Sequence, residues 1–329
     1  MAVGVFWPAR VLPEDDGATA GTVPGGSSGA ALAAQLSAVF PGADQCQTLQ
    51  VIGDAVDNPR APVSGAGGIF NEAGALLTPQ KADYDEDAPL GRPDRIGVDI
   101  EKLAEHVCGS ALDVLRLFTY AEMKNRAGVV GQAGLGPLLL RLGQDARVRI
   151  HLMGHSFGAR LVAHSLAGLG PAQDAQDTPI KSLVLIQGAF SHFSFASAII
   201  YCPEPGTAGA LAPLAGLVDG PLLATFSAAD RALGEWYPMA SMLQHEDLAL
   251  LDHPVYRWGA MGHDGFQQAT AVTRPLQRQG SRYDLARGGF YRLDANAVIN
   301  ADQSRFSGAH SDICHAEILW AAVSAAGLV

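Results

Sequence analysis

The residue types best suited to chemistry lie in GHSFG, at positions 154–158 of the stretch RVRIHLMGHSFGARLVAHSLAGL (147–169). A β-prone run stops at this Gly-x-Ser-x-Gly sequence, and an Ala/Leu-rich helix follows. This setting indicates a nucleophile elbow, a sharp turn that lifts the Ser156 hydroxyl above the edge of a sheet. Small residues two positions before and after the serine let backbones approach closely. The Phe157 amide, at the helix N-terminus, is placed to stabilise an oxyanion.

The strand, GHSFG and helix together resemble the nucleophile region of the α/β-hydrolase superfamily, in particular its bacterial esterase- and lipase-like members. The resemblance implies an α/β fold with a mostly parallel central sheet flanked by helices. It also implies triad residues in the chain order serine, acid, histidine, and a reaction that needs no cofactor.

A serine nucleophile requires a base and an acid that orients the base. Asp230, in SAADRALG, follows a predicted strand at 221–227, which is where the superfamily places its acid. The alternative is a surface-turn aspartate or a helix N-cap. Asp264 is the best substitute for the acid.

The base is expected in a loop before the last helix, and His310 in GAHSDICHAEI precedes a predicted helix at 311–325. His263, in GAMGHDGFQ after a predicted strand at 255–258, is the rival. However, another strand pair and a helix follow His263 in the sequence. His155 is interpreted as a packing residue that points away from Ser156.

The resemblance implies a second oxyanion donor from an early loop. The loop Phe6-Trp7-Pro8-Ala9 is the best candidate, with Trp7 as the donor. An aromatic cluster after the predicted strand 181–187 is expected to edge the active-site mouth, although core packing explains it equally well. Its members are Phe190, His192 and Phe193.

Hydrophobic periodicity predicts the elements that position these residues. Strands are expected at 148–152, 181–187 and 221–227, with a strand pair at 290–300, and helices at 98–124 and 135–142. Alternating strands and helices predict an α/β sheet in a single domain, 1–329. Insertions are expected at about 58–95 and 201–220. Tyr120 and Lys124, near the end of the long helix, either line a pocket or cap the helix.

The overall composition excludes some classes of binding partner. The chain has 329 residues, is 48% hydrophobic and carries a formal net charge of −11. Without a Lys/Arg-rich stretch, this acidic balance argues against nucleic acid. No apolar run reaches the roughly 18 residues of a spanning helix, and the first residues lack a basic signal-peptide region. A cytoplasmic protein without stable membrane insertion is expected. The histidines show no metal-binding spacing.

The sequence therefore predicts a serine hydrolase that cleaves a small-molecule carboxylic ester through an acyl-enzyme. Three alternatives remain open. The same triad can serve acyl transfer or perhydrolysis, and a hydrolase fold can be a catalytically silent ligand-binding module. An interfacial lipase would need an apolar lid, whereas residues 58–93 are acidic.

Overall fold

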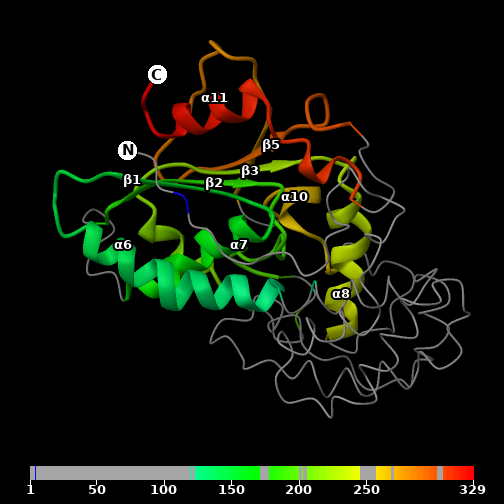
Figure 1. Cartoon of the computed structure of the whole chain (residues 1–329), viewed down its shortest axis with the longest axis horizontal. Helices are drawn as coiled ribbons and strands as arrows, with labels where there is room; N and C mark the ends of the chain where they lie inside the picture. The colour runs from blue at the N-terminus through cyan, green and yellow to red at the C-terminus, as the bar shows by residue number, and fades with distance from the viewer. Residues whose placement is uncertain are drawn as a thin grey trace, which may run out of the picture.

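The computed structural model describes Gly4, Tyr120, 123–170, 178–199, Cys202, 206–244, 257–267, 270–301 and 307–329. The remaining residues, including Trp7 and the predicted insertion at 58–95, lie outside the described part. Figure 1 shows a central sheet with helices on both of its faces. No helix in the described ranges is long and apolar enough to cross a membrane.

Within the described residues, the sheet contains five strands in the order β1-β2-β3-β5-β4, and every neighbouring pair is parallel. The strands are β1 (Ile150–His155), β2 (Ile180–Ile186), β3 (Leu222–Phe226), β4 (Val272–Pro275) and β5 (Phe290–Asp294). The expected α/β class is therefore confirmed. Because the strands are parallel, their carboxyl ends meet at one edge of the sheet.

Helices cover the two faces unequally. In Figure 1, α6 and α7 lie on one face and α11 lies on the other. In chain order, the helical segments are η3 (Val130–Leu135), α6 (Gly136–Leu142), α7 (Phe157–His164), η4 (Ser165–Leu169), η5 (Ala212–Leu217), η6 (Ala232–Trp236), α8 (Tyr237–Gln244), α10 (Met261–Asp264), η7 (Ala309–Ser311) and α11 (Ala316–Ala325).

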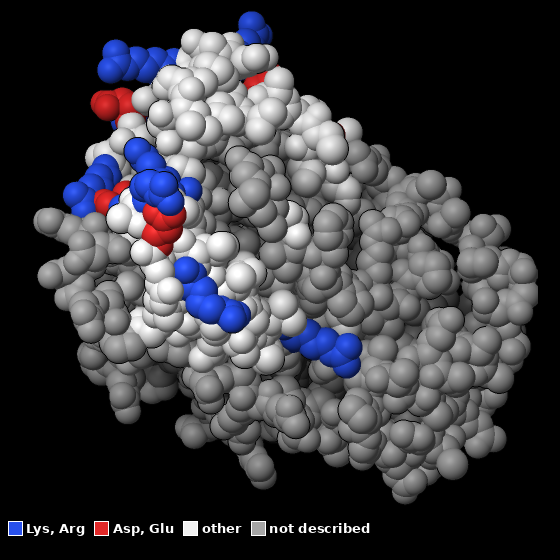
Figure 2. All heavy atoms as spheres, turned by 60° about the vertical axis from the view of Figure 1, so that its left-hand side comes forward, with Lys and Arg blue, Asp and Glu red and all other residues white. Residues whose placement is uncertain are grey.

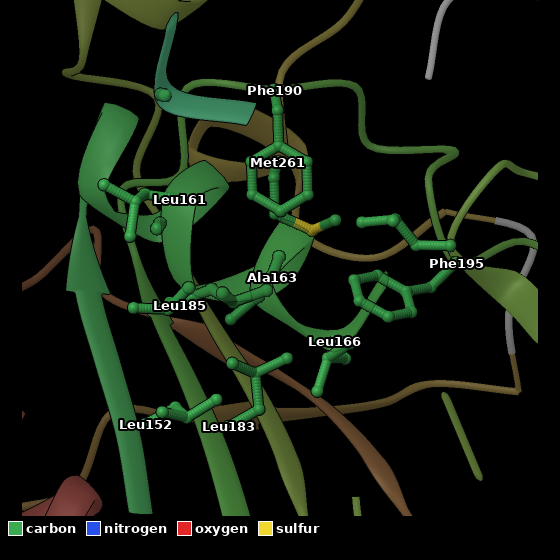
Figure 3. Close-up of a cluster of buried hydrophobic side chains, with 14 of the residues drawn as sticks. Leu152, Leu161, Ala163, Leu166, Leu183, Leu185, Phe190, Phe195 and Met261 are labelled. Carbon is green, nitrogen blue, oxygen red and sulfur yellow. The ribbon is translucent and has the colours of Figure 1, made fainter. Parts of the chain in front are cut away.

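The side chains of β2 explain why both faces are covered. Leu183 and Leu185 pack into the core under α7, whereas Val184 and Ile186 pack into a second core under α11. Successive side chains of a strand point to opposite faces, so a strand that is apolar throughout needs cover on both. Figure 3 shows the first core, where Leu161 from α7 lies near Leu185.

Two predicted helix boundaries were wrong. The expected break after Lys124 is absent, because residues 123–129 are helical and continue through the π-helical η3 into α6. The final helix begins at Ala316 instead of 311, because η7 and the irregular residues 312–315 come first. His310 nevertheless precedes that helix, as predicted.

Two predicted strands also differ. Where a strand pair was predicted at 290–300, a single strand forms, β5, and it ends at Asp294. Asp294 Oδ1 accepts hydrogen bonds from the backbone and side-chain amides of Asn296, and this turn ends the strand. In the predicted strand at 255–258, the described residues Arg257 and Trp258 are not extended. The predicted insertion at 201–220 contains the short helix η5.

The amino end of the sheet carries paired charges. Lys181 Nζ lies 2.6 Å from Asp219 Oδ2, and Arg287 bonds the other oxygen of the same carboxylate. Figure 2 brings forward the left-hand side of Figure 1, where blue and red side chains lie close together.

Candidate active site

Ser156 occupies a strained turn between β1 and α7. Its φ is 57° and its ψ is −126°, a conformation that L-residues rarely adopt and that persists only when the surroundings impose it. The Ser156 amide donates to the Ile186 carbonyl at 3.0 Å, and the Ser156 carbonyl accepts from Ala189 at 3.1 Å. The ends of β1 and β2 therefore hold the turn on both sides.

The two glycines of GHSFG have different surroundings. A Cβ on Gly154 would lie 2.3 Å from the Gly158 carbonyl oxygen and 2.7 Å from the Ala159 amide nitrogen. A Cβ on Gly158 would meet no heavy atom within 4 Å. The expectation that both positions need a small residue therefore holds only for Gly154.

The three predicted residues Ser156, His310 and Asp230 form a continuous hydrogen-bonded chain. The distances are 2.7 Å from His310 Nε2 to Ser156 Oγ and 2.7 Å from His310 Nδ1 to Asp230 Oδ2. An ionised carboxylate only accepts hydrogen bonds, so Nδ1 carries the proton of the neutral ring. Nε2 is then left as the acceptor for the serine hydroxyl.

Asp230 uses its two oxygens separately. Oδ1 accepts from the Leu233 amide at 3.0 Å, as an N-cap does, while Oδ2 faces His310. The side chain is fully buried, and His310 is 13% exposed. Asp230 therefore fits both interpretations at once: Oδ1 caps a helix N-terminus, and Oδ2 is the partner of His310.

A glycine turn brings the histidine loop to Asp230. Gly308 has a φ of 54° and forms an isolated β-bridge with Asp230. The Ala309 amide donates to the Ala229 carbonyl at 2.9 Å. A Cβ on Gly308 would lie 2.5 Å from that same carbonyl oxygen, so only glycine allows this approach.

His155 contacts the triad, which the sequence interpretation did not foresee. Its Nε2–H donates to the His310 carbonyl oxygen at 2.9 Å, and the two rings lie 4.9 Å apart. Burial, followed by the charge of His310, lowers the pKa of His155 to about 4. A neutral His155 therefore links the elbow to the histidine loop. Residue spacing offers no signal from which this contact could be predicted.

His263 and Asp264, the rival base and acid, belong to a separate cluster. Asp264 bonds His192 Nδ1 at 3.0 Å through one oxygen and His263 Nδ1 at 2.9 Å through the other. Burial raises the pKa of Asp264, but the bonds from the two histidines outweigh it and lower the pKa. The hydrogen bond that His263 Nδ1 donates to Asp264 raises the pKa of His263.

The predicted substrate residues are buried. Phe190, His192 and Phe193 are each 0% exposed. Phe190 packs beside Met261 in the core of Figure 3, and Phe193 belongs to a cluster with Trp258. The structure thus favours core packing for these residues over a place at the active-site mouth. Trp7, the predicted second oxyanion donor, lies outside the described residues.

A different aromatic group lies next to the elbow. The Tyr120 ring is 4.6 Å from the Phe157 ring and 6.1 Å from the Tyr237 ring. Its hydroxyl is buried and has no hydrogen-bond partner among the residues that the structure describes. Burial, then the proximity of Tyr237 and of Asp230, raises the pKa of Tyr120. Lys124, also buried, donates to Ser241 Oγ at 3.3 Å. These residues therefore do not simply cap a helix end.

Comparisons with protein-family models, with curated proteins and with solved structures found no match for this chain. Among the described residues, no group of three or more His, Cys, Asp or Glu side chains could hold a metal ion.

Proposed function

We propose that the protein is a serine hydrolase of the α/β-hydrolase fold that cleaves carboxylic esters. The observation that carries the proposal is the chain Ser156–His310–Asp230, with both bonds at 2.7 Å and the serine at a positive φ. A strained, partly exposed nucleophile in contact with a base that a buried acid orients is the arrangement that acyl transfer requires.

The mechanism follows from these contacts. Ser156 Oγ attacks the ester carbonyl while His310 Nε2 takes its proton, and Asp230 stabilises the imidazolium. The Phe157 amide is in the first turn of α7, where amides have no intrahelical acceptor, and is available to the oxyanion. The alkoxide leaves with the proton from His310. Water, deprotonated by His310, then hydrolyses the acyl-enzyme.

The test is covalent labelling beside turnover. A fluorophosphonate probe is expected to modify Ser156, as mapped by mass spectrometry, and p-nitrophenyl esters are expected to be hydrolysed. Ser156→Ala should lose both. A well-folded protein without label on Ser156 would indicate the catalytically silent module instead. Acyl transfer and perhydrolysis share the acyl-enzyme, and adding an alcohol or hydrogen peroxide to the assay distinguishes them from hydrolysis.

A matched pair of variants tests the base. His310→Ala should lower kcat by about 10⁴-fold or more, because the members of a triad act as a unit. His263→Ala removes a partly buried histidine that also bonds an aspartate, and it should retain most of the turnover. The opposite result, with turnover lost only in His263→Ala, would reassign the base.

A further inference from the structure

Gln187 lies directly after β2 and is the second non-glycine residue of the described chain with a positive φ, 43°. The other is Ser156. The side chain of Gln187 is fully buried, and its backbone amide donates to Thr225 Oγ1 at 3.0 Å. Such a conformation costs energy and points to a constraint at a functional site.

Two groups fix the amide of Gln187 independently of the triad. Nε2 donates to the Gly262 carbonyl at 3.1 Å, and Oε1 accepts from the Thr225 hydroxyl at 3.0 Å. A carbonyl cannot donate, so the NH₂ group must face Gly262. The same NH₂ group reaches Asp230 Oδ2 at 2.9 Å. The protein thus presents a preset donor to the triad carboxylate.

We propose that Gln187 is a positioning residue that acts on His310 through Asp230. The inference rests on the proposed function, because it assigns a role within that triad. Asp230 Oδ2 accepts from both Gln187 and His310, while the Leu233 amide holds Oδ1 in place. Loss of the Gln187 donor therefore leaves the carboxylate in position but removes one of the hydrogen bonds that offset its negative charge. The carboxylate then interacts more strongly with the His310 ring. The imidazolium form of His310 becomes more stable.

Several titratable groups face the pair of His310 and Asp230. His155 contacts His310 from the end of β1, and its pKa of about 4 keeps it neutral over most of the useful pH range. The pKa of His263 is raised mainly by its hydrogen bond to Asp264 and that of Tyr120 mainly by burial, and the negative charge of Asp230 adds to both. A measurement must therefore resolve His310 from the other histidines.

The test compares Gln187→Leu with the isosteric Gln187→Glu. In kcat/KM for p-nitrophenyl acetate against pH, we expect Gln187→Leu to lower the plateau about tenfold. The acidic limb should move to higher pH by about half a unit to one unit. Gln187→Glu should move it further, because an ionised Glu adds negative charge beside Asp230. A purely structural role would lower the plateau without moving the limb.

NMR titration of the His310 ring, assigned with His310→Gln, provides a readout that needs no turnover. We expect the titration midpoint of His310 to be lowest in the wild type, higher in Gln187→Leu and highest in Gln187→Glu. If the wild type hydrolyses no ester and takes no label, the proposed function fails, and the NMR shift still tests Gln187. Unchanged midpoints in both variants would overturn the role of Gln187 even in an active enzyme.

A control variant separates this effect from lost packing. Thr178→Val removes a buried hydroxyl that donates to the Leu217 carbonyl at 2.6 Å, at the opposite edge of the sheet. It should lower stability and leave the His310 midpoint unchanged. If the Gln187 variants do not fold, Thr225→Val keeps Gln187 but loosens its amide. It should then shift the midpoint in the same direction by less, and an unshifted midpoint would reject the proposal.

Discussion

Gly154 and Gly158 flank Ser156 symmetrically in the sequence, but only Gly154 is held there by its neighbours. The Cβ of an alanine at 154 would collide with backbone atoms, which cannot move away as a flexible side chain can. Position 158 is open and helical. The motif thus combines one steric requirement with one position that packing does not restrict.

This difference predicts opposite effects of two identical substitutions. Gly154→Ala should lower the free energy of unfolding by about 2 kcal/mol or more and reduce probe labelling of Ser156, because the elbow must shift. Gly158→Ala should be neutral or stabilising by up to about 1 kcal/mol, because alanine favours a helix over glycine. Urea unfolding of both variants measures this. Equal destabilisation would contradict the steric argument.

At the level of elements, the ends of β1, β2 and β3 each supply part of the site. β1 leads into Ser156, β2 into Gln187, and β3 into the turn that carries Asp230. His155 adds a connection from the end of β1 to the histidine loop. The loop is therefore fastened both to the Asp230 turn and to the elbow.

The low pKa of His155 predicts a pH dependence of stability. In the folded protein its pKa is about 4, and in the unfolded chain it is near the ordinary value of 6.5. Between these values the unfolded chain binds a proton that the folded protein does not, so stability falls as the pH decreases. His155 accounts for a loss of about 2 kcal/mol between pH 7.5 and 5.

The variant His155→Gln keeps a donor for the His310 carbonyl but does not titrate. Its unfolding free energy, measured in urea at both pH values, should fall by about 2 kcal/mol less than that of the wild type. The difference between the two proteins isolates this histidine, because the other acid-sensitive groups are common to both. An equal loss would show that His155 titrates alike in the folded and unfolded states.

The sequence predicted those parts of the fold and site that depend on local patterns. The apolar strands and the turn at Ser156 are local, and Asp230 and His310 were found by their order relative to strands and the last helix. The role of Gln187 was not predictable, because its partners Thr225, Asp230 and Gly262 come from three later segments. The prediction of a strand pair at 290–300 was wrong because the hydrogen bonds from Asn296 to Asp294 stabilise a turn where the second strand would have begun.

On the scale of the whole molecule, the two edges of the parallel sheet carry different chemistry. The amino edge holds partly buried ion pairs such as Lys181–Asp219. The carboxyl edge holds the buried Asp230 and the strained Ser156. Ligands of open parallel sheets bind outside the carboxyl ends of the strands, which is consistent with the location of the candidate site.

The long span of the triad has a consequence for folding. The bond from His310 to Ser156 joins residues 154 positions apart, and the bond from His310 to Asp230 joins residues 80 apart. Contacts between such distant residues form slowly, because the chain must lose entropy before they contribute stability. The helix α7 and the strand pair β1–β2, by contrast, involve nearby segments.

In refolding from urea, far-UV circular dichroism should therefore recover before the rate of fluorophosphonate labelling does. Ser156 would be present throughout, yet it would react only after the histidine loop had docked. Coincident recovery of both signals would show that the loop docks as early as the sheet forms. The reactivity of Ser156 would thus report when the last stage of assembly is complete.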